Sequence, residues 1–221
     1  EAALATRERA AAERTQLMLR RFEEYEAEYA QRAAAEAAAR AQCGPTTFFR
    51  PAEPQVLLVV RLKGVNKLCP RVRKVFQLFR LLQLHNAVFL KVNTATRQML
   101  KFIEPFVAFG APNLATVRAL VYKRGYLRLG PAGAYSRVAI CDNAQIEERL
   151  GRFDVRGVED IVHTLYTCGP HFKEVNKALW TFKLHAPRGG FACKRHGFAE
   201  FRKGTWGDHE DLINVLVQRM L

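Results

Sequence analysis

Long blocks of hydrophobic and polar positions divide the chain into an N-terminal arm and a folded body. Residues 1–41 are dominated by Ala, Glu and Arg and contain neither Gly nor Pro. These residue types favour a helix, and Glu28 and Arg32 stand four positions apart in the order that stabilises one. The pattern predicts a helix of about 60 Å over residues 1–42. A linker that carries three prolines follows over residues 43–54.

The larger apolar residues of the arm follow a 4-3-4 spacing, at Met18, Phe22, Tyr25 and Tyr29. A coiled coil has the same spacing, but this seam is short and is flanked by Ala. We therefore expect the patch to dock on a neighbouring protein rather than to form a dimer. The arm also contains eight Glu, which argues against a mitochondrial targeting helix, because such helices are poor in acidic residues.

The body begins near Gln55 and alternates short apolar runs with amphipathic segments. The runs predict strands at 56–62, 87–92 and 106–109, and the segments between them predict helices at 70–82 and 94–103. The expected core positions of these two helices are Val72, Val75, Phe76, Phe79, Leu82, Met99, Phe102 and Ile103. This order predicts an α+β sandwich over residues 55–112, with its helices on one face of the sheet. The other face, or the loops at the strand ends, would then be free for a ligand.

The remainder of the body divides into a mostly helical extension, residues 113–187, and a basic Gly-rich loop with a C-terminal helix, residues 188–221. Extended segments at 126–129 and 135–140 flank a Gly-Pro-Ala-Gly turn. Helices are predicted from Asn113 to the residue before Gly125, from a capping box of Asp142 and Gln145 to Gly151, at 158–168, at 171–180, and from Asp208 to the end. In the last helix, Leu212, Ile213, Leu216 and Val217 are expected to face inward.

Charge changes this picture of an ordinary α+β protein. The formal net charge is +14, whereas the seven Arg and eight Glu of the arm nearly cancel, so the excess belongs to the body. Residues 61–103 hold ten basic residues and no acidic one. Such a surface points to nucleic acid or an anionic membrane. A solvated charged face usually mixes signs, and this one does not, so we expect a polyanionic partner, RNA.

The candidate RNA-binding residues fall in three groups. The first follows the first strand and continues along the next helix, and the second is the Lys-Arg pair that precedes Gly125. The third lies in the Gly-rich segment 187–203, where Gly would let the backbone approach phosphate and Phe191 and Phe198 could stack on bases. A disordered basic loop is the alternative for this segment. Together the candidates are Arg61, Lys63, Asn66, Lys67, Arg71, Arg73, Lys74, Arg80, Lys123, Arg124, Arg188, Gly189, Gly190, Lys194, Arg195, Arg202 and Lys203.

Residue patterns typical of catalysis or metal binding are weak. The five cysteines are scattered without a C-x-x-C pair, which favours reduced thiols over a zinc site. The sequence has no P-loop, H-E-x-x-H or G-x-S-x-G motif. Asp160 and His163 could hydrogen-bond on one helix, but Cys168 lies off that face. We therefore expect no enzyme activity, metal, cofactor or small-molecule substrate, and we expect His196 to face phosphate.

Several long motifs of the body resemble one family. They include Arg61-Leu62-Lys63-Gly64-Val65-Asn66, the run from Pro70 to Leu78, the run from Glu104 to Leu114, Tyr122-Lys123-Arg124-Gly125-Tyr126, and Pro187-Arg188-Gly189-Gly190. The chain, over about residues 55–221, resembles the large-ribosomal-subunit protein family called L-seven in eukaryotes and L-thirty in bacteria. Only the first sixty or so residues of the body resemble the shorter bacterial form.

The resemblance implies a split βαβ, ferredoxin-like core and a structural role in translation and subunit assembly. It implies binding to large-subunit rRNA, with 5S rRNA nearby, and a cytoplasmic location after nucleolar passage. It also implies an N-terminal helix that runs over rRNA. The arm of this chain is less basic than family arms usually are, and the tract after Gly190 is less densely basic, so neighbouring ribosomal proteins become expected partners of the arm.

Other functions remain open on the sequence alone. A paralogous assembly factor that binds precursor rRNA is the nearest alternative. A DNA-binding regulator would place the helix from Pro70 in a major groove. An enzyme would need a role for His163. No apolar run reaches the roughly 20 residues of a membrane-spanning helix, and we expect no membrane partner.

Overall fold

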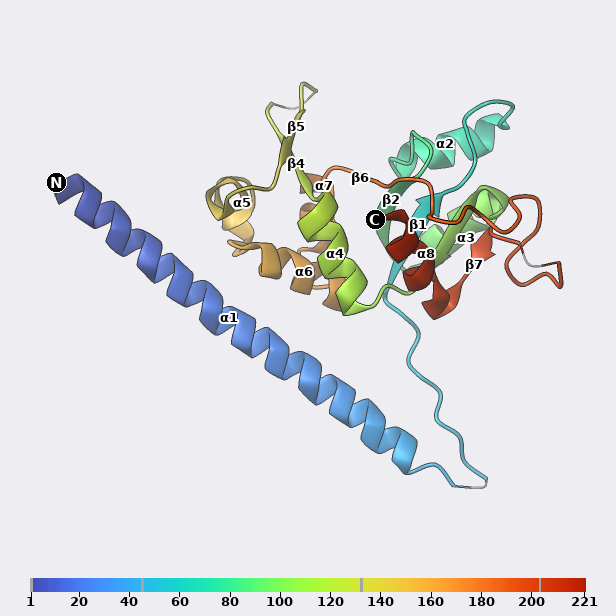
Figure 1. Ribbon diagram of the computed structural model, residues 1–221, viewed down its shortest axis with the longest axis horizontal. Helices are drawn as coiled ribbons and strands as arrows, with labels where there is room; N and C mark the ends of the chain where they lie inside the picture. Colours follow the sequence, from blue (N-terminus) through green and yellow to red (C-terminus); the bar gives the residue numbers. More distant parts are fainter. Residues whose placement is uncertain (1, 45, 132, 203) are drawn as a thin grey trace. The chain divides into compact units, whose positions relative to one another are not determined.

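The computed structural model describes residues 2–44, 46–131, 133–202 and 204–221, and the side chains from residue 11 onward. The chain forms two compact units, an N-terminal unit that ends at Glu53 and a body of Pro54–Leu221. Helix α1, Ala2–Ala41, confirms the long helix predicted for the arm (Figure 1). The ion pair between Arg32 and Glu28 forms at 3.4 Å. Both side chains are about half exposed, so the pair stabilises the helix only slightly.

A mixed five-stranded sheet organises the body. Its strands are β1 (Val56–Arg61), β2 (Asn86–Lys91), β3 (Val107–Gly110), β6 (Phe182–Lys183) and β7 (Gly207–Asp208), in the order β6-β2-β1-β3-β7. The central strand β1 is antiparallel to β2 and β3, β6 is antiparallel to β2, and β7 is parallel to β3. The predicted order strand, helix, strand, helix, strand is confirmed, and two short later strands widen the sheet.

The helices of the body are α2 (Pro70–Leu78), α3 (Thr94–Ile103), α4 (Leu114–Arg124), α5 (Asn143–Leu150), α6 (Val158–Thr167), α7 (Phe172–Ala178) and α8 (Ile213–Met220). Single 3₁₀ turns follow α3 (η1, Glu104–Phe106) and α5 (η2, Gly151–Phe153), and another precedes α8 (η3, Glu210–Leu212). Strands β4 (Tyr126–Leu129) and β5 (Ser136–Ala139) form the predicted hairpin, which stands apart from the main sheet (Figure 1).

Both faces of the sheet are buried, so the prediction of a free sheet face is wrong. Leu58 and Val60 point into one apolar cluster with residues of α4, α6, α7 and α8, whereas Val59 points into a second cluster with residues of α2 and α3. All three side chains have no exposed surface. The run VLLVV of β1 is apolar at every position, and such a run is typical of a strand covered on both sides. Any ligand surface must therefore lie at the ends of the strands or on the helices.

Helix α2 ends four residues earlier than the sequence predicts. Arg80 has a φ of 61°, in the left-handed region, which turns the chain so that Leu81 is fully buried. Leu82, expected in the core, is 58% exposed instead. Nothing local in this segment breaks a helix. The burial of Leu81 and the contacts that Arg80 makes with a distant helix outweigh the helical propensity.

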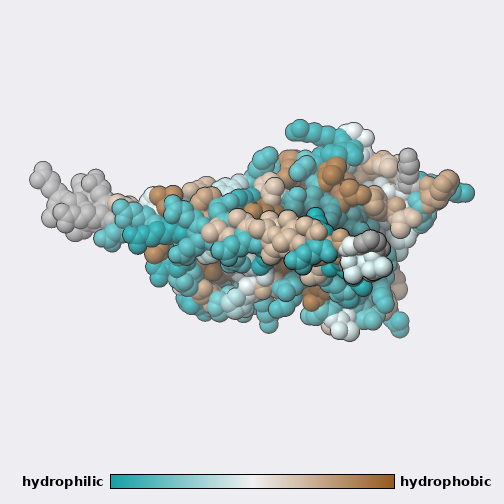
Figure 2. Space-filling view, turned by 90° about the horizontal axis from the view of Figure 1, so that it is seen from below, coloured by the Kyte–Doolittle hydropathy of each residue, from teal (hydrophilic) through white to brown (hydrophobic). Residues whose placement is uncertain are grey.

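Smaller corrections have local causes. Phe102 and Leu212 are exposed rather than buried, and Leu100 occupies the core position in α3. Asp142 is the N-cap of α5, as predicted, but its side chain accepts a hydrogen bond from the backbone N–H of Ala144. The predicted capping box with Gln145 is not seen. Hydrophilic side chains cover much of the face seen in Figure 2, with hydrophobic residues between them.

Gly110 tests the packing of β3 against the C-terminal helix. A Cβ atom there would lie 2.2 Å from the Glu210 carbonyl oxygen and 2.9 Å from Cβ of Ile213. We expect Gly110→Ala to lower the free energy of unfolding by about 1–3 kcal/mol through overpacking, measured by urea unfolding. Gly64→Ala is the control, because nothing lies within 4 Å of the point where its added Cβ atom would stand. Equal stability of the two variants would contradict the packing described.

Candidate nucleic-acid interface

The loop after β1 and the outer face of α2 present a continuous set of basic side chains. Lys67, Arg71, Arg73 and Lys74 are exposed, and Lys63 is half-buried with its Nζ 5.4 Å from the Phe106 ring centroid. In the described part of the chain, none of these five cations is paired with a carboxylate. Because the opposite face of α2 is buried, the helix holds its cations in fixed positions.

Arg61, a candidate RNA-binding residue, lies inside the protein and is only 1% exposed. Its guanidinium donates hydrogen bonds to the carbonyl oxygens of Lys63 (2.8 Å), Leu81 (2.6 Å) and Gly64 (2.8 Å). It also lies over the Phe76 ring at 4.1 Å, and burial lowers its pKa. Arg61 therefore shapes the loop that carries Lys63 and Lys67. It is a structural residue and not the exposed ligand contact that the sequence predicted.

Arg80 is also engaged within the protein. Its guanidinium donates to the carbonyl oxygens of Leu179 (2.9 Å) and Asn176 (2.8 Å), at the C-terminal end of α7. A cation is favourable there, because unpaired carbonyls and the helix dipole both attract it. Burial, together with the nearby Arg128, lowers the pKa of Arg80 to about 10, so it stays charged at neutral pH.

The Gly-rich segment is folded, and a residue that the sequence did not single out holds it. Arg219 of α8 donates from Nε (2.9 Å) and Nη2 (2.7 Å) to the Arg188 carbonyl oxygen, and from Nη2 to that of Gly190 (2.9 Å). Gly189 and Gly190 have φ values of 79° and 74°, which a side chain would strain. The Arg188 side chain is left exposed.

The rest of this segment uses its aromatic and polar residues internally. His196 Nδ1 lies 2.9 Å from Glu200 Oε2. His196 therefore faces a carboxylate, whereas the sequence predicted that it would face phosphate. The N–H of Gly197 and the His196 ring lower the pKa of Glu200. The Phe198 ring stacks on His209 with a centroid distance of 4.0 Å. Arg195 and Arg202 remain exposed, and Lys203 lies outside the described residues.

Three separate segments meet at one end of the sheet. His85, in the turn before β2, donates its backbone N–H to the Arg61 carbonyl oxygen at 2.9 Å, and its ring lies 5.8 Å from that of Phe191. Lys194 Nζ lies 4.3 Å from the Phe191 ring centroid. Burial, with Lys194 and His185 nearby, lowers the pKa of His85. The first and third groups of candidate residues therefore come together around this turn.

The second candidate group joins the same end through the C-terminus. Arg124, the last residue of α4, donates to the Leu221 carbonyl oxygen at 2.9 Å, and His185 donates its backbone N–H to that of Met220 at 3.0 Å. Lys123 is exposed. The end of the sheet thus gathers basic side chains that lie far apart in the sequence.

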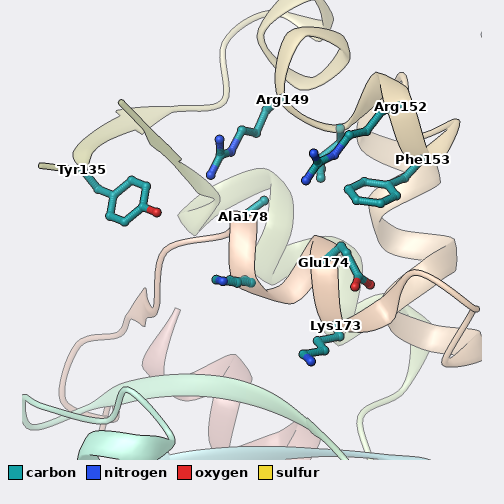
Figure 3. Close-up of a pocket in the computed structure, with 9 residues that line it drawn as sticks. Tyr135, Arg149, Arg152, Phe153, Lys173, Glu174 and Ala178 are labelled. Carbon is teal, nitrogen blue, oxygen red and sulfur yellow. The ribbon is translucent and has the colours of Figure 1, made fainter. Parts of the chain in front are cut away.

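A further basic hollow was not predicted from the sequence. Arg149 and Arg152 extend from α5 and η2 over α7, which contributes Lys173 and Lys177, and Tyr135 borders the opening (Figure 3). The hollow has a volume of about 320 Å³. Its residues come from three separate segments, around 135, 149–153 and 173–178, so no local pattern in the sequence indicates it.

Two other kinds of site find no support in the described residues. Among them, no three His, Cys, Asp or Glu side chains are grouped closely enough to hold a metal ion. No helix in the part of the chain searched is both long and apolar enough to cross a bilayer.

The described part of the body is thus an α+β protein with a basic surface, whose cations on α2 and the loop after β1 have no carboxylate partner. The family model described as ribosomal protein L30p/L7e matches residues 57–107. The large ribosomal subunit protein uL30B of Paramecium tetraurelia is 48% identical over 174 residues, which cover 79% of this chain and 68% of that protein. Proteins named uL30 from Yarrowia lipolytica and uL30B from Schizosaccharomyces pombe are 41% and 42% identical over 99% and 100% of this chain, and each alignment covers 86% of the relative.

The chain therefore belongs to the L30p/L7e family of large-subunit ribosomal proteins, which confirms the resemblance seen in its motifs. The two fungal alignments span nearly the whole chain, so they include the N-terminal helix as well as the body.

Substitutions of Arg61 and Arg73 distinguish a buried cation that holds the fold from an exposed cation. Arg61→Ala leaves three carbonyl oxygens without their donor, and we expect it to lower the free energy of unfolding by about 3 kcal/mol or more. Arg73→Ala, on the exposed face of α2, should change it by less than about 0.5 kcal/mol. Urea unfolding of both variants measures the difference. A wild-type midpoint for Arg61→Ala would show that the buried guanidinium does not hold the loop.

Proposed function

We propose that this chain is a structural constituent of the large ribosomal subunit that binds and stabilises large-subunit rRNA through the loop after β1 and the outer face of α2. The proposed contacts are Lys63, Asn66, Lys67, Arg71, Arg73 and Lys74. Lys123, Arg124, Arg188 to Gly190, Lys194, Arg195 and Arg202 flank them. Lys203 belongs to the same proposal on its sequence alone, and Arg61 and Arg80 act through the backbone that they hold.

The unpaired cations of α2 are the observation that carries this proposal. Fixed cations without carboxylate partners repel one another, and a phosphate backbone relieves this repulsion while it releases counterions. Contacts to phosphate position a protein on RNA without reading its sequence. The proposed role is therefore to bind and stabilise folded rRNA, and it requires no catalysis.

Family membership supports the wider setting of the proposal. The relatives named above are proteins of the large ribosomal subunit. We therefore propose that this protein is located in the cytoplasmic ribosome, after nucleolar passage during assembly. We also propose that 5S rRNA lies close to the site, and that the N-terminal helix contacts neighbouring ribosomal proteins. Its charges nearly cancel, which favours a protein surface over phosphate for part of its length.

The role of an assembly factor on precursor rRNA uses the same surface chemistry. The relatives' names favour the mature subunit. Sedimentation decides between the two roles: a constituent stays with mature large subunits through a high-salt wash, whereas an assembly factor is found on precursor particles.

The salt dependence of binding tests the α2 surface. In the full chain, we expect the combined change Arg71→Ala, Arg73→Ala and Lys74→Ala to weaken binding to large-subunit rRNA. The slope of log K against log salt should fall by about 0.7–0.9 for each lost phosphate contact. Filter binding at several salt concentrations measures both quantities.

The matched control keeps the charge. The pair Arg71→Lys and Arg73→Lys should retain most of the salt slope, because each position still holds a cation. A slope that is unchanged by the triple alanine change would remove α2 from the interface.

A further inference from the structure

Three neighbouring hollows lie along α7 and just beyond its C-terminal end. They are separate from the α2 surface, which is the loop after β1 and the outer face of α2. The first is the basic hollow of Figure 3. The second, of about 370 Å³, shares Lys173 and Lys177 with it. The third, of about 270 Å³, shares Arg80 with the second. Neighbouring hollows share lining side chains and therefore lie next to one another, and we call the three together the α7 groove.

The α7 groove is strongly basic. Its lining contains eight cations and one carboxylate, Glu174; the cations are Arg80, Lys91, Arg128, Arg149, Arg152, Lys173, Lys177 and Lys183. None of the eight is paired with a carboxylate among the described residues. A concave surface of one charge sign concentrates the opposite charge, so the groove suits an extended anionic chain.

Two mostly buried polar residues line the third hollow. Asn86 is 4% exposed and Thr181 is 9% exposed. Their carboxamide and hydroxyl groups give this hollow hydrogen-bonding groups beside its cations.

Aromatic rings lie where bases could stack. Trp180 lines the third hollow, Tyr135 and Phe153 line the first, and Arg128 joins the two. The Arg128 guanidinium carbon lies 4.3 Å from the Tyr135 ring centroid and 5.8 Å from that of Trp180. Because the rings lie against the faces of the guanidinium, its N–H edge is the part that a phosphate could approach.

We propose that the α7 groove binds a single-stranded segment of RNA, with one unstacked base in the hollow of Asn86, Thr181 and Trp180. A basic groove with aromatic platforms is the general design for unpaired strands. The carboxamide and hydroxyl groups that line this hollow can bond the edge of a base, which a duplex would keep paired. The proposal rests on the proposed function for its choice of RNA, but it concerns a different surface and a different form of RNA.

Binding of short RNA to the full chain tests the groove. The probes are an unstructured 10-nucleotide RNA and a duplex of the same composition, measured by fluorescence anisotropy. The groove variant combines Arg149→Gln, Arg152→Gln and Lys177→Gln. We expect it to bind the single strand about tenfold more weakly, with a salt slope lower by about 0.7 for each lost contact. The charge-matched control combines Arg20→Gln, Arg50→Gln and Lys101→Gln, three exposed positions that line none of the three hollows, and it should bind the single strand within about twofold of wild type.

A second variant tests the base hollow without changing charge. Trp180→Leu should weaken single-strand binding about fivefold or more through lost stacking, while the salt slope stays unchanged. Circular dichroism confirms that each variant is folded. If Trp180→Leu unfolds the chain, Asn86→Ala provides the same comparison.

The outcomes separate this proposal from the proposed function. Equal loss of single-strand binding in the groove variant and the charge-matched control, or wild-type binding by the groove variant, would overturn the groove proposal. Binding of poly-glutamate as tight as that of the oligonucleotide would assign the groove to an acidic protein and also overturn it. Failure of the α2 surface would appear instead as rRNA binding that the α2 triple variant does not change.

Discussion

Burial of the sheet on both faces is the constraint on which the rest of the structure depends. Strand β1 has no solvent face, since Leu58, Val59 and Val60 are all fully covered. Charged side chains are therefore confined to strand ends, helix surfaces and loops. The body carries all of the net positive charge of the chain, because the arm is slightly acidic. This confinement gathers part of the charge where the loop after β1, the turn at His85 and the C-terminus meet.

The cations of the body serve two purposes that the sequence does not distinguish. Arg61 and Arg80 each bind backbone carbonyl oxygens, and in doing so they fix the loop after β1 and the end of α7. Arg219 does the same for the Gly-rich segment. These internal arginines hold the backbone that presents Lys67, Arg71 and Arg73 to solvent. A rigid set of exposed cations loses little conformational freedom when it binds a phosphate backbone.

Much of the fold, but less of the site, could be predicted from the sequence. Apolar runs and helical periodicity gave the β-α-β-α-β order, because burial of one stripe or one strand leaves a local pattern. The exposed cations of α2 were also visible, since their spacing on the helix follows from the buried positions Val75 and Phe76. The burial of Arg61 depends on carbonyls brought together by the tertiary fold. The α7 groove combines side chains from positions 80 to 183, so no window of sequence contains it.

The most direct measurement is the structure of this chain within its native large subunit, determined by cryo-electron microscopy. We expect the guanidinium and ammonium groups of Arg71, Arg73 and Lys74 to lie within about 4 Å of rRNA phosphate oxygens, the distance of an ion pair. We also expect Arg61 to keep its three carbonyl partners. Side chains of α2 that point to bulk water, or to carboxylates of a neighbouring protein, would contradict the central claim.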